Sequence, residues 1–228
     1  MDRICAVIVA GGRGSRMNSP QSKQFIEIKG KPIIYYTLAA FDNNPDIDDI
    51  ILVLPKDEIQ KFYDEVLKKF SFNKLSSIVQ GGKQRQDSVY NGLKAVKDCS
   101  IVLIHDGARP FVSMDIIKEG IKYAEIYGAC ACGVIPKDTI KIRSKDNFSE
   151  FTPDRSALFA VQTPQCFKYD LILKCHEHIA EEGILVTDDT MAVEALGHRV
   201  YLYEGDYKNI KITTPEDLIV AEKLAENL

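Results

Sequence analysis

Apolar, largely β-branched runs alternate along the chain with segments of helical periodicity, and this alternation is the feature that most constrains the fold. The apolar runs are residues 4–10, 49–55, 76–80, 100–106 and 129–136. The segments of helical periodicity include residues 57–70, 85–97 and 113–127. Such alternation predicts right-handed βαβ units, and hence an α/β fold with one doubly wound, mostly parallel sheet covered by helices on both faces. At 228 residues, the whole chain, 1–228, is expected to form a single domain.

Two prolines mark the starts of predicted helices. Pro32 suits the first turn of a helix that runs through about Asp42, because its missing N–H lies where a helix offers no partner. Pro215 suits the first turn of the last helix, for which Thr214 is the expected N-cap and Asp217 stands at the third position.

Residues 137–160 interrupt the alternation with a segment of mixed polar and apolar residues that has no helical periodicity. The stretches “TIKIR” and “SEFTP” flank “SKDN”, a pattern that predicts a β-hairpin protruding from the main sheet. A polar hairpin with little core of its own needs a surface to pack on. We therefore favour a dimerisation arm, which makes the protein a homodimer; the alternative is a solvated edge ribbon.

The overall charge and hydropathy bound the class of partner. The net charge is −4 and the calculated pI about 5.6, so no basic field favours nucleic acid or an anionic membrane surface. The longest apolar runs are far shorter than the ~20 residues of a membrane helix. The first of them follows Asp2 and ends in glycine and arginine, unlike a signal peptide. We predict a cytoplasmic protein without nucleic-acid or membrane partners.

Cysteine and histidine show no metal-binding pattern. The six cysteines are scattered among apolar neighbours and are expected to be reduced, buried thiols. His176 and His178 are two residues apart, a spacing that does not converge on one face of a helix. The sequence therefore predicts no metal site built from protein ligands alone.

A glycine-rich segment, “VAGGRGSRM” (9–17), follows the first apolar run. A dinucleotide-binding fingerprint would need a third glycine where Met17 stands, and a P-loop would need a glycine–lysine pair that the segment lacks. Both are disfavoured. The flexible backbone at Gly11, Gly12 and Gly14 can still approach a ligand closely and point N–H groups at a phosphate.

Positive charge gathers around this segment. Between residues 10 and 31 the chain carries five bases against one acid, Glu27, a local charge of +4 in an acidic protein. The bases are Arg13, Arg16, Lys23, Lys29 and Lys31. Pro20 and its polar neighbours predict that Arg16 and Lys23 lie on an extended loop, which can fold both side chains over a polyphosphate. The alternative is a solvated basic loop.

Polar clusters follow other predicted strands as well. “GGKQRQDSVYNGL” (81–93) and “HDGARPFV” (105–112) each come directly after an apolar run, so Asp106 and Arg109 are expected at the same sheet edge as the glycine-rich segment. Further polar clusters at predicted element boundaries are “TPQ” (163–165), “TDD” (187–189) and “NIKITTPEDL” (209–218).

Taken in order, these motifs resemble those of the 2-C-methyl-D-erythritol 4-phosphate cytidylyltransferase family of the non-mevalonate isoprenoid pathway. The resemblance runs nearly end to end, through “AGGRGSRM…PQSKQF”, “GGKQRQDSV”, “HDGARP”, “KDTIK”, “DRS”, “QTPQ”, “VTDD” and “NIKITTPEDL”. It implies a Rossmann-like nucleotidyltransferase fold and an enzyme that joins the phosphate of methylerythritol phosphate to the α-phosphate of CTP and releases pyrophosphate. It also implies Mg²⁺ as a bridge between CTP phosphates, with no protein ligand named.

The resemblance assigns roles to individual residues. Arg16 and Lys23 are expected to stabilise the transition state, and Arg155 and Lys211 to hold the incoming phosphate for attack. The residues expected to bind CTP are Ala10, Gly11, Gly12, Gly14, Gly82, Ser88, Asp106 and Gly107. The residues expected to bind the polyol phosphate are Asp106, Arg109, Thr139, Arg155, Thr163 and Lys211. Thr139 and Arg155 lie on the predicted arm, and the resemblance implies that they reach the active site of the neighbouring subunit.

Three alternative functions are weighed against this one. A ribitol-5-phosphate cytidylyltransferase would share fold and chemistry, but is expected to carry valine where this chain has Ala108. A nucleotide-binding module without turnover would not need both Arg16 and Lys23. An NAD-dependent oxidoreductase is disfavoured by the missing third glycine.

Overall fold

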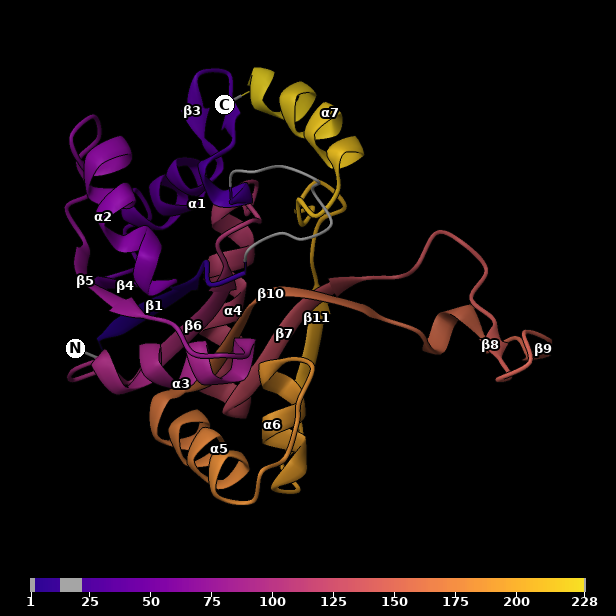
Figure 1. Cartoon of the computed structure of the whole chain (residues 1–228). Coiled ribbons are helices and arrows are strands. Elements are labelled where there is room, and N and C mark those ends of the chain that lie inside the picture. The colour runs from indigo at the N-terminus through magenta and orange to yellow at the C-terminus, as the bar shows by residue number, and fades with distance from the viewer. Residues whose placement is uncertain (1–2, 13–21, 228) are drawn as a thin grey trace.

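A seven-stranded mixed sheet forms the centre of the computed structural model, which describes residues 3–12 and 22–227 (Figure 1). In spatial order its strands are β11 (Tyr201–Glu204), β7 (Ala129–Val134), β10 (Ala160–Lys168), β6 (Ile101–Asp106), β1 (Ile4–Val9), β4 (Asp49–Leu54) and β5 (Leu75–Gln80). Neighbouring strands pair in parallel, except that β10 is antiparallel to both β6 and β7. The predicted α/β fold with a mostly parallel sheet is confirmed.

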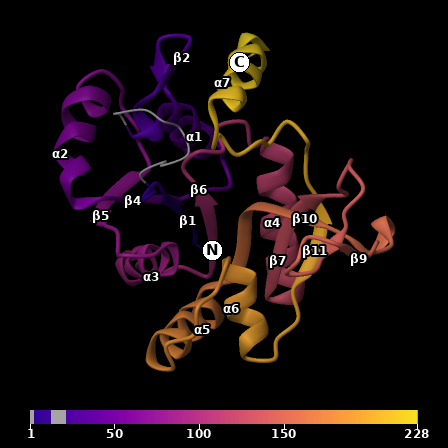
Figure 2. The same cartoon turned by 45° about the vertical axis from the view of Figure 1, so that its right-hand side comes forward.

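Helices cover both faces of the sheet (Figures 1 and 2). On one face are α1 (Ile33–Asp42), α2 (Ile59–Phe62) and α4 (Met114–Tyr127); on the other are α3 (Arg85–Ala95), α5 (Tyr169–Glu181) and α6 (Asp189–Ala195). The side chains of β1 divide between the two resulting cores: Ala6 and Ile8 join one, while Cys5, Val7 and Val9 join the other. Since both faces of β1 are buried, apolar side chains are favoured at all of its positions, which explains such uninterrupted runs in the sequence.

A third, small core lies beside the main sheet. It joins a short antiparallel ribbon, β2 (Glu27–Ile28) and β3 (Lys31–Pro32), to the last helix, α7 (Pro215–Leu224). The buried side chains there are Ile28, Ile33, Ile212 and Ala221. These contacts hold the segment 209–214, which leads into α7, against residues 26–33.

Local signals set several of the helix ends. α4 begins after Ser113, whose hydroxyl accepts from the N–H of Ile116, and ends at Gly128, whose φ of 83° is the left-handed conformation that glycine adopts without strain. Thr214 and Asp217 form the capping box of α7, as predicted. The single helix predicted over 57–70 is wrong: a 3₁₀ turn precedes the short α2, and a π-helical turn follows it.

Strand β10 differs from what the sequence predicted. “TPQ” (163–165) was expected at an element boundary but lies within β10, where the pairing register shifts between Val161 and Gln165. That irregularity lets the strand hold polar side chains, and Thr163 and Gln165 are both buried and hydrogen-bonded. Polar residues in a strand interior look like a loop when only the sequence is read.

The chain leaves the sheet after β7 and returns at β10, and the intervening arm projects away from the body (Figure 1). Within it β8 (Ile142–Arg143) pairs antiparallel with β9 (Ser149–Phe151), and a 3₁₀ turn at Arg155–Ala157 follows. The predicted protruding hairpin is confirmed. Its apolar side chains are open to solvent: Phe148 is 72% and Phe151 56% exposed. Its role in dimerisation stays a prediction, as does the assignment of residues 1–228 to one domain.

Two further features of the structure concern the cysteines and the lengths of the helices. All six cysteines are free; five are buried and Cys99 is half-buried. Within residues 3–12 and 22–227, no helix has the length and apolar character needed to cross a bilayer.

Candidate functional site

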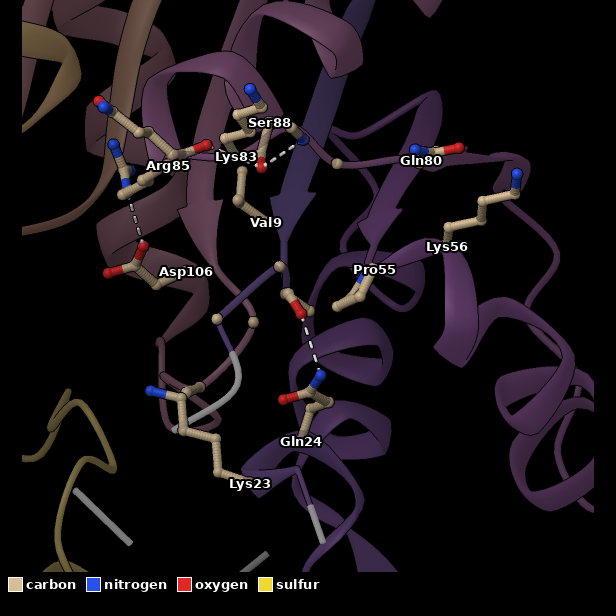
Figure 3. A pocket seen from close by; sticks show the side chains of 18 of the residues that line it. Val9, Lys23, Gln24, Pro55, Lys56, Gln80, Lys83, Arg85, Ser88 and Asp106 are labelled. Carbon is tan, nitrogen blue, oxygen red and sulfur yellow. Dashed lines mark hydrogen bonds and ion pairs between the residues drawn. The ribbon is translucent and has the colours of Figure 1, made fainter. Parts of the chain in front are cut away.

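A cavity of about 700 Å³ opens at the carboxyl ends of β1, β4, β5 and β6 (Figure 3). This is the edge at which open parallel sheets bind ligands, because the loops that follow the strands converge there. The described residues that line it are 9–12, 55–57, 80–85 and 106–108, together with Lys23, Gln24, Ser88 and Lys211.

The structure gathers most of the predicted site residues at this cavity. Nine of them line it: Ala10, Gly11, Gly12, Lys23, Gly82, Ser88, Asp106, Gly107 and Lys211. Four described ones do not: Arg109, Thr139, Arg155 and Thr163. The remaining two, Gly14 and Arg16, lie outside the described residues.

Asp106, the last residue of β6, is the centre of a charged cluster. One carboxylate oxygen accepts from Nε of Arg85 at 3.2 Å, and the other lies 2.7 Å from Nζ of Lys211 and 3.8 Å from Nε of Arg109. Burial works to raise the pKa of Asp106, but Arg85 and Lys211 outweigh it and hold this pKa well below its usual range. The carboxylate is therefore ionised and fixed by cations of the same chain.

Arg85 lines the cavity and pairs with Asp106, but the sequence interpretation did not name it as a site residue. It is the first residue of α3 and lines the cavity, and its Nη2 donates to Asp189 at 2.8 Å while Nε pairs with Asp106. The signal was present, because “GGKQRQDSV” was already expected at the sheet edge. Nothing in the sequence said which of its polar residues would turn toward Asp106.

The loop between β5 and α3 is shaped by contacts within itself. Ser88 is buried; its hydroxyl accepts from the N–H of Gly82 at 3.0 Å and donates to the carbonyl of Gln84 at 3.1 Å. A Cβ at Gly82 would lie only 2.2 Å from Cβ of Asp87, so only glycine lets the loop turn this closely on the helix. Ser88 thus holds the glycine turn against the cavity, and its predicted contact with the cytosine stays a prediction.

Lys23 lies at the cavity in a 3₁₀ turn, Lys23–Phe25, so the predicted extended conformation is wrong for this residue. The turn is fixed by Gln24, whose side-chain amide donates to the carbonyl of Ala10 at 3.1 Å and to Glu58. Nζ of Lys23 donates to the carbonyl of Ile212 at 3.1 Å. This contact brings Lys23 beside Lys211, although the two lie at opposite ends of the sequence.

A layer of buried polar groups supports the cavity floor. The hydroxyl of Thr163 accepts from the N–H of Asp106 at 3.0 Å and lies 3.2 Å from Nδ1 of His105, whose Nε2 is 3.0 Å from the carbonyl of Arg109. These partners are consistent with a neutral His105 protonated at Nε2, and burial lowers its pKa to about 4. Nη1 of Arg109 donates to the carbonyl of Asn209 at 2.7 Å. Here Arg109 and Thr163 bind protein groups.

Thr139 and Arg155 lie together on the arm. Nη2 of Arg155 donates to the hydroxyl of Thr139 at 3.1 Å, and both residues are exposed. Within one chain, therefore, two of the predicted acceptor-binding residues form a pair outside the cavity.

Metal binding by the protein alone has little support in the described parts of the chain. No group of three or more His, Cys, Asp or Glu there is arranged to hold an ion. The acidic residues lining the cavity are Asp57 and Asp106, and Asp106 is already paired with cations. An ion at this site would take most of its ligands from a bound phosphate and water.

Comparisons with known proteins agree with one another. The family model for 2-C-methyl-D-erythritol 4-phosphate cytidylyltransferase matches residues 4–227. The chain is 64% identical to the protein of that name from Clostridium perfringens (strain SM101 / Type A), over 97% of this chain and 98% of the relative. It is 60% identical to that from Clostridium novyi (strain NT), over 100% and 99%. Among solved structures, 4-diphosphocytidyl-2C-methyl-D-erythritol synthase from Anaerococcus prevotii superposes with a TM-score of 0.87 at 34% identity, covering 99% of this chain and 96% of that one.

Proposed function

Because the chain belongs to the 2-C-methyl-D-erythritol 4-phosphate cytidylyltransferase family, we propose that the cavity at the carboxyl edge of its sheet is where CTP and the polyol phosphate meet. The enzyme joins 2-C-methyl-D-erythritol 4-phosphate to the α-phosphate of CTP and gives 4-diphosphocytidyl-2-C-methyl-D-erythritol and pyrophosphate, in isoprenoid precursor biosynthesis. The observation that carries the placement is that glycine turns and basic side chains line the same cavity.

We propose that the nucleoside of CTP lies against the glycine turns. Ala10, Gly11 and Gly12 follow β1, and Gly82 and Gly107 follow β5 and β6, so three strands present backbone groups to one space. Backbone N–H and carbonyl groups can match the amine and carbonyl of cytosine. Ser88 supports this site by fixing the Gly82 turn, and Gly14 completes the predicted set.

The triphosphate is assigned to the basic side of the cavity. Transfer of a nucleotidyl group requires positioning and charge stabilisation more than covalent chemistry by the protein, so cations near the α-phosphate are the main requirement. Lys23 supports this assignment, because its hydrogen bond to the carbonyl of Ile212 holds it at the rim. Arg16 stays the predicted partner of Lys23 in stabilising the transition state, and its guanidinium suits two phosphate oxygens at once.

The acceptor site is proposed to be completed by a second subunit. Thr139 and Arg155 lie on a projecting arm outside the cavity of their own chain, and the arm exposes the apolar side chains of Phe148 and Phe151. A homodimer in which each arm covers the partner would bury these side chains and bring Arg155 toward an incoming phosphate. Lys211, with Asp106 beside it, would hold that phosphate from the other side. Arg109 and Thr163 stay predicted acceptor contacts.

Mg²⁺ is proposed to arrive with the nucleotide. When bound with CTP, it would neutralise part of the charge of the phosphates and would rely on few protein ligands. The lining carboxylates fit this limited role, since Asp106 is already paired with Arg85 and Lys211. The cytoplasmic location stays a prediction from the sequence.

The deciding experiment measures pyrophosphate release from CTP with Mg²⁺, in parallel with 2-C-methyl-D-erythritol 4-phosphate and with ribitol 5-phosphate. Release with the first acceptor is the expected result. Preference for ribitol 5-phosphate would leave the donor site standing but reassign the acceptor. Binding of CTP without release in either mixture would favour the nucleotide-binding module instead.

A further inference from the structure

The Thr187-Asp188-Asp189 sequence at the start of α6 has no role in the site described so far. Asp188 has a local one, because it caps the helix by accepting from the N–H of Met191 at 3.0 Å. Asp189 is different: its side chain is 1% exposed and does not line the described cavity. A buried carboxylate is costly unless it is paired, so its partners indicate why it is there.

The partners of Asp189 lead directly to the cavity. One carboxylate oxygen accepts from Nη2 of Arg85 at 2.8 Å, and the other lies 3.2 Å from Nε2 of buried His176. Arg85 in turn pairs through Nε with Asp106, which is shared with Lys211. This chain of contacts links α5 and α6 to α3 and β6, and so runs from the space between α5 and α6 to the cavity (Figure 3 shows the Arg85–Asp106 pair).

The geometry restricts Arg85 to one orientation. A guanidinium has a rigid, planar fork, so binding one carboxylate through Nε and another through Nη2 fixes both its position and its plane. Neither ion pair uses Nη1. Without Asp189, Arg85 would pair with Asp106 alone and could turn to bind it with two nitrogens, in competition with Lys211.

We propose that Asp189 is a positioning residue for the CTP site, acting through Arg85. By holding Arg85 from outside the cavity, Asp189 keeps Asp106 shared between Arg85 and Lys211 and keeps the wall beside the Gly82 and Gly107 turns in a shape that accepts the nucleotide. The inference rests on the proposed function, since it takes the cavity to be the CTP site.

The test compares Asp189→Ala and Asp189→Asn with Glu194→Gln, which removes an exposed carboxylate from the same helix. Binding of CTP is measured by calorimetry without acceptor, and kcat and KM for CTP are measured in the complete reaction. Asp189→Ala is expected to weaken CTP binding and raise KM for CTP by about tenfold, with kcat lowered no more than about threefold. Asp189→Asn should stay within about threefold of the parent, because its carbonyl can still accept from Arg85. Glu194→Gln should not differ from the parent.

A second pair of variants separates positioning from a purely structural role. If Asp189 acts through Arg85, the double variant Arg85→Gln/Asp189→Ala should bind CTP no more weakly than Arg85→Gln alone. Additive losses, unchanged CTP binding in Asp189→Ala, or a fall in kcat that parallels a fall in Tm would each overturn the inference. If Asp189→Ala does not fold, the other two variants decide. Retained CTP binding in Asp189→Asn together with weakened CTP binding in Arg85→Gln supports the inference. Weakened CTP binding in Asp189→Asn together with retained CTP binding in Arg85→Gln overturns it.

The design also separates this inference from the proposed function. Weakened CTP binding in Asp189→Ala, in a protein that releases no pyrophosphate with either acceptor, would refute the proposed function and support the positioning role. Failure of the parent protein to bind CTP would overturn both.

Discussion

The cavity and the arm contain residues predicted for the same reaction, but the two regions are built in opposite ways. At the cavity, Asp106 is buried and held by Arg85, Lys211 and Arg109, each from a different part of the chain. On the arm, Thr139 and Arg155 are exposed and share one hydrogen bond. The chain thus preorganises the groups in the cavity. On the arm, the orientation of Arg155 is set mainly by its hydrogen bond to Thr139.

This contrast separates two ways of losing activity. Preorganised charges need no rearrangement when substrate binds, so a change among them should affect catalysis or substrate affinity while the fold and assembly persist. In the proposed dimer, residues on the arm act only when the partner receives them, so a change there should affect assembly or the half-site that the arm completes.

The largest effect is expected from removing the arm. Replacing residues 141–157 by a short glycine–serine linker should give a folded monomer with no detectable turnover, because the sheet does not depend on the arm, whereas the proposed acceptor site does. Sedimentation measures the mass, calorimetry the retained binding of CTP, and pyrophosphate release the loss of activity. Full activity in a monomer would remove the distinction between the two regions.

Lys23→Ala should lower kcat by about 10²–10³ and change CTP binding much less, because a preorganised cation at the transferred group acts mainly in the transition state. Initial rates of pyrophosphate release at saturating CTP give kcat, and calorimetry gives the dissociation constant for CTP. Lys94→Ala, on the exposed side of α3, is the matched loss of one lysine and should behave as the parent. Equal losses in kcat and in affinity would mean that Lys23 only binds substrate.

Mixing two inactive variants sharpens the comparison further. In a heterodimer of Lys23→Ala and Arg155→Ala, an arm that acts on the partner leaves one site with both residues intact. Random reassociation makes half of the dimers mixed, so about a quarter of the parental activity should return. Co-refolding of differently tagged chains gives this random mixture, and the mixed dimers purified on both tags should show about half of the parental specific activity. An arm that serves its own cavity would leave every site defective, and no activity would return.

The same contrast explains what could be predicted from the sequence. Strands buried on both faces favour apolar residues, and parallel strands bring their carboxyl ends to one edge, so the sheet and the location of the cavity followed from the pattern of residues. The Arg85–Asp189 pair joins residues 104 positions apart, and only tertiary packing decides that this arginine turns to a buried carboxylate. The antiparallel β10 was missed because its buried polar side chains match neither a strand nor a helix pattern.

The smallest effect is expected from the buried polar layer under the cavity. It concerns the free energy of unfolding rather than turnover. Burial lowers the pKa of His105 to about 4 from an ordinary value of 6.5, so the unfolded chain binds this proton more readily than the folded one. The stabilisation that this histidine supports is complete above about pH 6.5 and falls as the pH drops toward about 4, by at most about 1.4 kcal/mol per pH unit. Urea unfolding across that range should show the slope in the parent and in His198→Gln, whose histidine is exposed, but a shallower one in His105→Gln. An unchanged slope in His105→Gln would mean that the acid sensitivity of the fold arises elsewhere. The hydrogen bonds of Thr163 and Arg109 to His105 would then support the cavity without coupling it to pH.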